Sequence, residues 1–116
     1  MTANEELQKE VQEYQMSQQQ LQIIMNQKVQ STMQIREVKD ALEELRTAAP
    51  GTDVFKSIGR VLIKADIGKL KKELSDDAET IDVRIKSLEK QEKKLKDKMG
   101  NMEKTLLPQL QKAKQG

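Results

Sequence analysis

A seven-residue repeat of apolar side chains constrains this chain more than any other feature of its sequence. The repeat occupies two long stretches, about residues 5–47 and 69–108. In the first stretch its two rows are Leu7, Tyr14, Leu21, Ile35 and Leu42, and Ile24, Val38 and Leu45. In the second stretch they are Leu74, Ile81, Leu88, Leu95 and Met102, and Ala78, Ile85, Glu92, Met99 and Leu106. Two rows of this period are the a and d positions of a coiled coil, so we predict two long helices that pack on each other.

The residues between the two stretches predict a β-hairpin. Pro50 and Gly51 favour a turn that ends the first helix. β-Branched and apolar residues then dominate residues 53–65, and Gly59 lies between two short runs of them. Because glycine tolerates the backbone angle that a two-residue hairpin turn requires, we place a tight turn at Gly59.

The second helix is expected to begin at about Lys69, after a short connector at residues 65–68 in which Asp66 can act as the N-cap. Pro108 should kink or end this helix and leave a frayed tail at residues 111–116. The hairpin reverses the chain, so the predicted fold is mainly α, a long antiparallel two-helix coiled coil within a single domain over residues 1–116. The distribution of charge agrees with an antiparallel arrangement. Residues 1–46 carry 5 basic and 8 acidic residues, whereas the remaining residues carry 16 basic and 11 acidic residues. Two halves of opposite net charge attract each other weakly.

The hairpin is too apolar to remain exposed to water. Its apolar residues, together with the turn glycine, are Val54, Phe55, Ile58, Gly59, Val61, Leu62 and Ile63. A lone two-stranded hairpin is only marginally stable and leaves its edges unpaired. We therefore expect these residues to pair with the hairpins of other chains, which predicts an oligomer. The alternative is a hairpin packed on its own helices, although two helices offer little core to cover it.

The antiparallel arrangement predicts a register for the two helices. If Leu45 meets Leu74, Lys28 lies level with Glu92, a charged residue that interrupts the second apolar row. We hypothesise a Lys28–Glu92 contact that fixes the register of the coiled coil more than it adds stability. The alternative is that each of these two side chains reaches solvent independently.

The composition excludes several classes of chemistry. The chain has no Cys and no His, which removes disulfides, imidazole catalysis and the common zinc ligands. Paired acids such as Asp76 and Asp77 fit a solvated helix better than a catalytic pair. Gly59 and Gly68 are isolated and form no phosphate loop. We therefore predict no enzyme, no cofactor and no metal. The polar N-terminus and the lack of a long apolar run predict an intracellular protein with no membrane partner.

A basic cluster in the second helix raises the question of a nucleic-acid partner. The cluster comprises Lys90, Lys93, Lys94, Lys96 and Lys98. Glu89, Glu92 and Asp97 interleave with these lysines, and the chain has only two aromatic residues. A solvated charged face is therefore favoured, and we predict no nucleic-acid partner. A structural coiled-coil adaptor for one defined protein partner is the main alternative function, although such an adaptor would not need an apolar hairpin.

The order of these features resembles one known family. The matching segments are Gln18–Gln22, Ala41–Leu45, Val54–Lys64, Arg84 and Leu88–Glu92. In this order the chain resembles the beta subunits of the prefoldin family over essentially its whole length, and its single hairpin fits the beta type. The resemblance implies a cytoplasmic hexamer of two alpha-type and four beta-type subunits, whose hairpins form a β-barrel platform. It also implies an ATP-independent chaperone that holds non-native protein at its coiled-coil tips and passes it to a group II chaperonin.

In this geometry both termini lie at the tip of the coiled coil, where apolar residues exceed what the seam requires. Those on the heptad rows are Leu7, Tyr14, Leu21, Met102 and Leu106, and for these seam packing and client contact are equally favoured. Those off the rows are Val11, Met16, Ile23, Met25, Leu107 and Leu110. We expect the second set to contact client proteins, because exposed apolar patches mark interaction sites and methionine adapts to varied partners.

Overall fold

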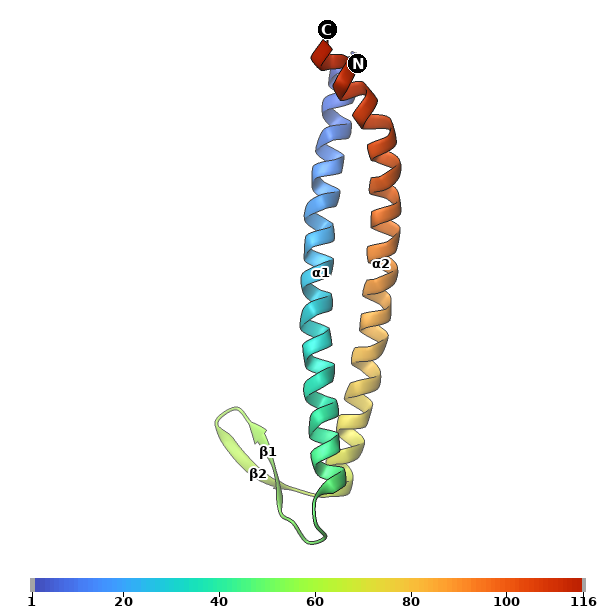
Figure 1. The fold of residues 1–116 in the computed structure, drawn as a ribbon. Coiled ribbons are helices and arrows are strands. Elements are labelled where there is room, and N and C mark those ends of the chain that lie inside the picture. The colour runs from blue at the N-terminus through green and yellow to red at the C-terminus, as the bar shows by residue number, and fades with distance from the viewer. Residues whose placement is uncertain (1, 116) are drawn as a thin grey trace. The chain divides into compact units, whose positions relative to one another are not determined.

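Two long helices with a short antiparallel hairpin between them make up the described part of the chain. A computed structural model describes residues 2–115. The elements follow in the order α1 (Ala3–Thr47), β1 (Val54–Ile58), β2 (Val61–Ala65) and α2 (Ile67–Gln115) (Figure 1). The predicted mainly-α architecture is therefore confirmed. Both helices begin two residues earlier than their repeats suggest, and α2 also ends later.

Helix α1 begins at Ala3 because the residue before it caps it. The hydroxyl of Thr2 accepts a hydrogen bond from the backbone N–H of Glu5 at 3.2 Å, and the Glu5 carboxylate accepts one from the Thr2 N–H at 3.4 Å. This reciprocal pair is a capping box, which satisfies donors that the first helical turn leaves free. The apolar repeat starts only at Leu7, so it could not predict that the helix includes this first turn.

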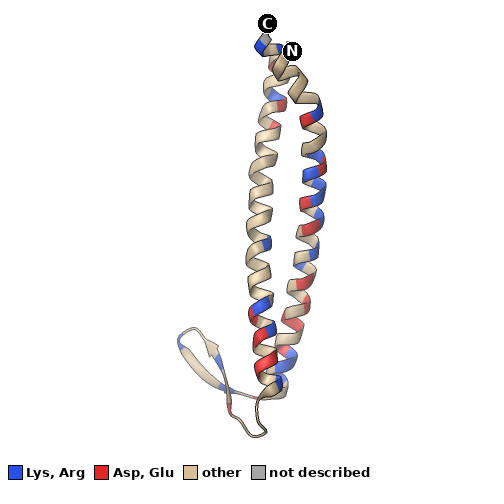
Figure 2. Ribbon diagram, viewed as in Figure 1, with Lys and Arg blue, Asp and Glu red and all other residues tan. Residues whose placement is uncertain are grey.

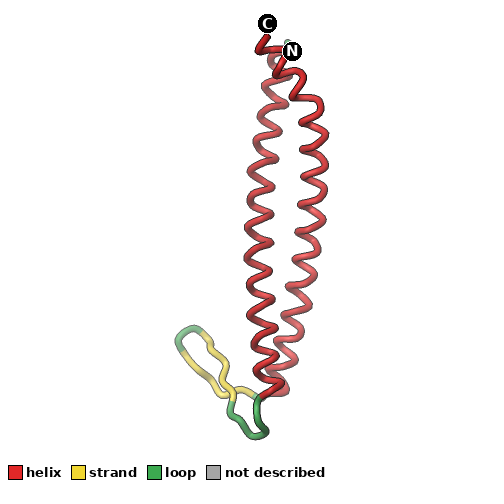
Figure 3. The backbone as a smooth tube through the Cα atoms, viewed as in Figure 1, coloured by secondary structure: helices red, strands yellow, loops and turns green. Residues whose placement is uncertain are grey.

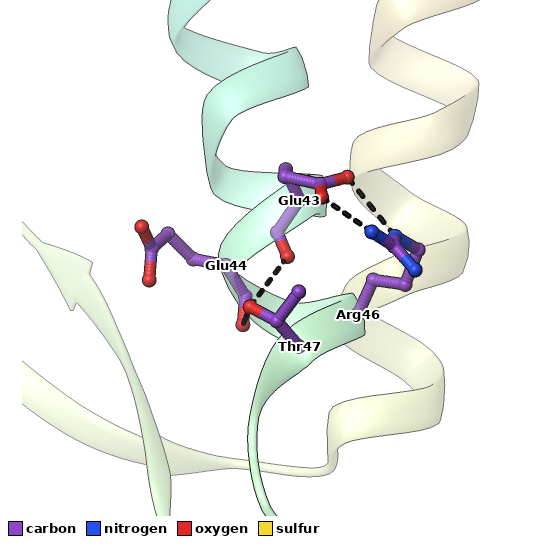
Figure 4. A network of polar contacts seen from close by, with 4 residues as sticks. All are labelled: Glu43, Glu44, Arg46 and Thr47. Atoms are coloured by element: carbon purple, nitrogen blue, oxygen red, sulfur yellow. Dashed lines mark hydrogen bonds and ion pairs between the residues drawn. The ribbon is translucent and has the colours of Figure 1, made fainter.

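The C-terminal turn of α1 is held by side-chain contacts. Arg46 donates two hydrogen bonds to the carboxylate of Glu43, at 3.0 and 2.5 Å (Figure 4). The hydroxyl of Thr47 donates to the carbonyl oxygens of Glu43 at 3.1 Å and Glu44 at 3.4 Å, one turn back along the helix. The chain then turns through Pro50 and Gly51, and Gly51 has a φ of +83°. The predicted turn at Pro50 and Gly51 is confirmed.

The hairpin has the predicted tight turn. Strand β1 pairs antiparallel with β2, with Ile58 opposite Val61 and Val54 opposite Ala65 (Figure 3). Two residues, Gly59 and Arg60, therefore connect the strands. Gly59 has a φ of +59°, the angle that a type II′ turn requires at its first central position.

Helix α2 begins two residues before its predicted start at about residue 69 and continues beyond its predicted end. The Asp66 carboxylate accepts a hydrogen bond from the N–H of Lys69 at 2.9 Å, which confirms Asp66 as the N-cap. The expected end near Pro108 and the frayed tail at residues 111–116 are corrected, because the helix runs through Pro108 to Gln115. Gly116 lies outside the described residues. A proline removes one helical hydrogen bond and crowds the preceding turn, and a bend can absorb both effects. The α2 ribbon changes direction in its red C-terminal turns (Figure 1).

The chain divides into two compact units, each with a part of α1 antiparallel to a part of α2. Unit 1 combines α1 up to Val29 with α2 from Lys86, and unit 2 runs from Gln30 to Ile85. Within unit 1 the buried cluster is Ile24, Leu88, Leu95 and Met99, with Tyr14 and Leu21 packed against it. All of these residues belong to the apolar rows. The single-domain assignment stays a prediction.

Polar residues occupy part of the α1 seam. Ser17 in unit 1 and Ser31 in unit 2 are both buried. Ser17 lies seven residues before Ile24 and Ser31 seven residues after it. The heptad row that is apolar at Ile24 therefore carries a small polar residue at the position before it and at the position after it. Glu10, one heptad before Ser17, has one buried carboxylate oxygen with no hydrogen-bond partner. Ser17 and Glu10 lie at row positions that the apolar repeat does not mark, so the sequence prediction missed both of them.

Lys28 and Glu92 meet across the seam of unit 1. Lys28 Nζ lies 3.3 Å from Glu92 Oε2, and the Glu92 side chain is 15% exposed. Lys96 also reaches Glu92, at 2.9 Å. Hydrogen bonds from Lys96 and then from Lys28 lower the pKa of Glu92 below its ordinary value. The structure thus contains the hypothesised contact, while its role in setting the register stays a prediction.

We expect Lys28 and Glu92 to be energetically coupled at neutral pH and uncoupled in acid. Because the folded-state pKa of Glu92 is lowered, its stabilising effect is present above the ordinary glutamate pKa and is lost as the pH falls through the folded-state value. A double-mutant cycle with Lys28→Ala and Glu92→Ala, followed by urea unfolding at both pH values, measures the coupling. The control is the same cycle on Glu43 and Arg46, which pair within α1. Additive effects of the Lys28 and Glu92 substitutions at neutral pH would contradict this expectation.

Two glycines offer a matched test of backbone effects. Gly100 lies inside α2, Gly59 has a positive φ, and neither has an atom within 4 Å of where a Cβ would stand. Gly100→Ala should stabilise the chain by up to about 1 kcal/mol through helix propensity. Gly59→Ala should destabilise the hairpin by about 1–2 kcal/mol, because alanine disfavours the left-handed region. Thermal unfolding measures the first change and hydrogen exchange of the hairpin amides the second. Changes of the same sign in both variants would refute this reasoning.

Candidate functional site

The hairpin is the first candidate surface, and its apolar side chains remain largely uncovered. The exposed ones are Phe55, Ile58, Val61, Leu62 and Ile63, of which Leu62 is the most exposed at 70%. Val54 is half-buried. The turn glycine, Gly59, is also exposed. An apolar surface of this kind, on an element with two free edges, is typical of a site where protein chains associate.

Both faces of the hairpin carry apolar residues. The strand register places Ile58, Val61 and Ile63 on one face, and Phe55 and Leu62 on the other. Only the base of the first face is partly covered, at Val54, Lys56 and Ala65. Lys56 there forms an ion pair with Glu73 of α2, also in unit 2. Packing on the chain's own helices thus covers part of one face only, and the predicted role in assembly stays a prediction.

The second candidate surface is the end of unit 1 that carries both termini (Figure 1). Among the predicted residues on the heptad rows, Leu106 is buried at 4% exposure. The others on the rows, Leu7, Tyr14, Leu21 and Met102, are half-buried. Among the residues off the rows, only Val11 is half-buried, while Met16, Ile23, Met25, Leu107 and Leu110 are exposed. With the exception of Val11, the rows thus separate covered from uncovered side chains, and Leu106 packs in the seam. Contact with client proteins stays a prediction for every residue of this set.

Tyr14 links the two helices of unit 1 through a polar contact. Its hydroxyl donates a hydrogen bond to the carboxylate of Glu103 on α2. This hydrogen bond is the main reason that the pKa of Tyr14 is raised, and burial of the hydroxyl is the second reason. Tyr14 therefore has a structural partner, which strengthens the seam interpretation for this residue.

Two shallow, solvent-open grooves lie on unit 1. The first is lined by Ala3, Asn4, Glu6, Leu7, Glu10, Gln109, Lys112 and Ala113. The second is lined by Glu13, Met16, Ser17, Gln19, Gln20, Ile23 and Lys98. Among residues 2–115, no cluster of acidic side chains could hold a metal ion. No helix in that range is long and apolar enough to cross a membrane.

Three further exposed apolar residues escaped the sequence prediction. They are Val29 in unit 1 and Met33 and Val83 in unit 2. All three lie off the heptad rows, and this property could have identified them.

Comparisons with known proteins agree with the fold. The family model described as "Prefoldin subunit" matches residues 8–113. The prefoldin subunit beta of Thermococcus onnurineus is 42% identical over 82 residues, which are 71% of each chain. That of Archaeoglobus fulgidus is 36% identical over 96 residues, which are 83% of each chain.

Solved structures give the same result. The crystal structure of the prefoldin beta subunit from Thermococcus strain KS-1 has a TM-score of 0.81 and 31% identity, over 90% of this chain and 92% of that one. The beta2 subunit from the same strain has a TM-score of 0.71 over 79% of this chain and 98% of that one, and at 14% identity it supports the fold alone. The chain therefore belongs to the prefoldin family of non-enzymatic chaperones, as a subunit of the beta type.

Proposed function

We propose that this chain captures unfolded protein at the end of its coiled coil that carries both termini. The observation that supports this most directly is a set of exposed apolar side chains there that the seam does not use. Leu107 and Leu110 belong to this set, and Met16, Ile23 and Met25 continue it along unit 1. Membership of a chaperone family makes non-native protein the natural ligand for such a surface.

The capture would be weak at each arm and strong in the assembly. We infer that the chain forms a cytoplasmic complex with alpha-type prefoldin subunits, with two alpha-type and four beta-type chains. The exposed hairpin residues, such as Phe55 and Leu62, would join the subunits through a β-barrel platform. Several arms could then hold one client, and avidity would multiply modest individual affinities.

Release would not need a nucleotide. No Gly-rich phosphate loop occurs in the sequence. A client held by several weak apolar contacts exchanges rapidly at each contact, so a second chaperone that competes for the same residues can take it over. We propose a group II chaperonin as that acceptor.

Removal of apolar side chains at the tip should abolish protection without loss of the complex. The variant Met25→Gln, Leu107→Gln and Leu110→Gln, assembled with an alpha-type partner, should suppress the aggregation of an unfolded model protein several-fold less well than the wild type. Light scattering without ATP measures this effect. The control is Val83→Gln, which alters a side chain of unit 2 that is 67% exposed. Full protection by the triple variant, or binding of only one defined partner by the wild type, would rule out the proposal.

A charge on the hairpin should prevent assembly. Leu62→Asp places a carboxylate on the most exposed apolar side chain of the hairpin, where burial against another chain would cost several kcal/mol. We expect the mass of the complex, measured by size-exclusion chromatography with light scattering, to fall while the helical circular dichroism stays unchanged. Val83→Asp makes the same change on α2 and should leave the mass intact. A complex of normal mass with Leu62→Asp would argue for a hairpin that is packed locally.

A further inference from the structure

The middle of α1 lacks the charges expected of a solvated helix. Residues 14–27 carry no charged side chain. Figure 2 shows this part of α1 in tan, whereas charged residues crowd the facing part of α2. Exposed apolar residues nevertheless occur here, with Met16 at 67% and Ile23 at 57% exposure. An uncharged helix face with exposed apolar side chains indicates a surface that becomes covered.

The second groove of unit 1 organises these residues. Met16, Gln20 and Ile23 line it from α1, and Lys98 lines it from α2. Ser17 is buried, so it belongs to the floor of the groove. Met16, Gln20 and Ile23 have the spacing i, i+4, i+7, which places them along one stripe of α1. This stripe is separate from the seam rows and is free to meet a third element.

Two charges mark the groove. Lys98 and Glu13 both line it, and neither has an ion-pair partner among residues 2–115. By the register that the contacts Lys28–Glu92 and Tyr14–Glu103 show, Lys98 lies about level with Gln20. Glu13 lies one heptad from Gln20, about 10 Å away along the helix. The groove therefore presents a positive group and a negative group at different levels, which gives it a direction.

We propose that this groove binds an amphipathic helical segment of a non-native polypeptide. Two apolar residues of the segment, one heptad apart, pack on Met16 and Ile23. A carboxylate of the segment meets Lys98, and a basic side chain meets Glu13. This assignment rests on the proposed chaperone function and specifies the class of client segment that one site selects.

The spacing of Met16 and Ile23 decides between a helical and an extended ligand. The two residues are one heptad apart, which is about 10.5 Å along a helix. A bound helix presents side chains at i and i+7 with the same separation and on the same face. An extended chain repeats a face about every 6.8 Å, so its side chains fall near 7 or 14 Å and miss the second position. The groove also offers no strand edge to pair with an extended backbone.

The test compares two labelled peptides of identical composition on the full chain. In the helix peptide, leucines follow i, i+4, i+7 spacing, with a glutamate placed to meet Lys98 and a lysine placed to meet Glu13. In the strand peptide, the same residues are ordered so that leucines alternate. Fluorescence anisotropy should show roughly tenfold tighter binding of the helix peptide, the scale expected from burial of its apolar side chains. Equal binding of both peptides would overturn the proposal.

Two sets of substitutions locate the binding. Met16→Gln with Ile23→Gln should weaken binding of the helix peptide about tenfold. The control Met33→Gln with Val83→Gln removes two similarly exposed apolar side chains from unit 2 and should change nothing. All four side chains are exposed, so circular dichroism should confirm unchanged helices. Unchanged affinity in the Met16 and Ile23 variant would overturn the assignment.

A charge exchange tests the direction of the bound helix. Lys98→Glu should weaken binding of the helix peptide, and a peptide with lysine in place of its glutamate should recover it. Failure of this exchange would overturn the role of Lys98.

An aggregation assay separates the groove from the chaperone function. Helix-selective binding without protection would refute the function and leave the groove, whereas protection with equal binding of both peptides would refute the groove and leave the function.

Discussion

The packing of two heptad rows against each other is the interaction on which the rest of this structure depends. A helix of this length and polarity is marginal in water until its apolar stripe is covered. The partner stripe is supplied by the same chain, and the hairpin at the turn lets it run back antiparallel. Buried residues such as Ile24 and Leu95 come from these rows. Contacts such as Lys28–Glu92 then join the helices at defined levels.

A two-helix seam buries only a narrow stripe, and this limit explains where function can arise. Two positions in every seven meet the partner helix, so apolar residues at other positions stay in contact with water. Met16 and Ile23 are exposed for this reason. The hairpin has the same property, because two strands cannot cover both of their own faces. The chain therefore leaves apolar side chains exposed both along unit 1 and on its hairpin.

The two helices differ in the kind of polar residue that they carry. Helix α2 is densely charged, whereas the middle of α1 carries amides, hydroxyls and exposed methionine (Figure 2). A charged helix face is strongly hydrated and resists burial, while an uncharged face can be covered at little electrostatic cost. Proteins could therefore be bound on one side of the coiled coil in preference to the other. On α2, Lys98 lines the groove beside Gln20 and has no ion-pair partner within the described chain.

The sequence by itself determined the helices, the hairpin, the turn at Gly59 and the cap at Asp66, because these depend on local propensity and on the period of apolar residues. It also placed Leu107 off the heptad rows as an exposed residue, whereas for Leu106 seam packing and client contact were equally favoured until the structure showed its burial. Tertiary structure decided what the period cannot encode. The burial of Ser17, the partial cover of Val11, the Tyr14–Glu103 contact and the groove at Lys98 each depend on which side chain of the second helix lies opposite. The tertiary structure likewise decided that α2 continues through Pro108. Local propensity alone allows a helix either to bend or to end at a proline.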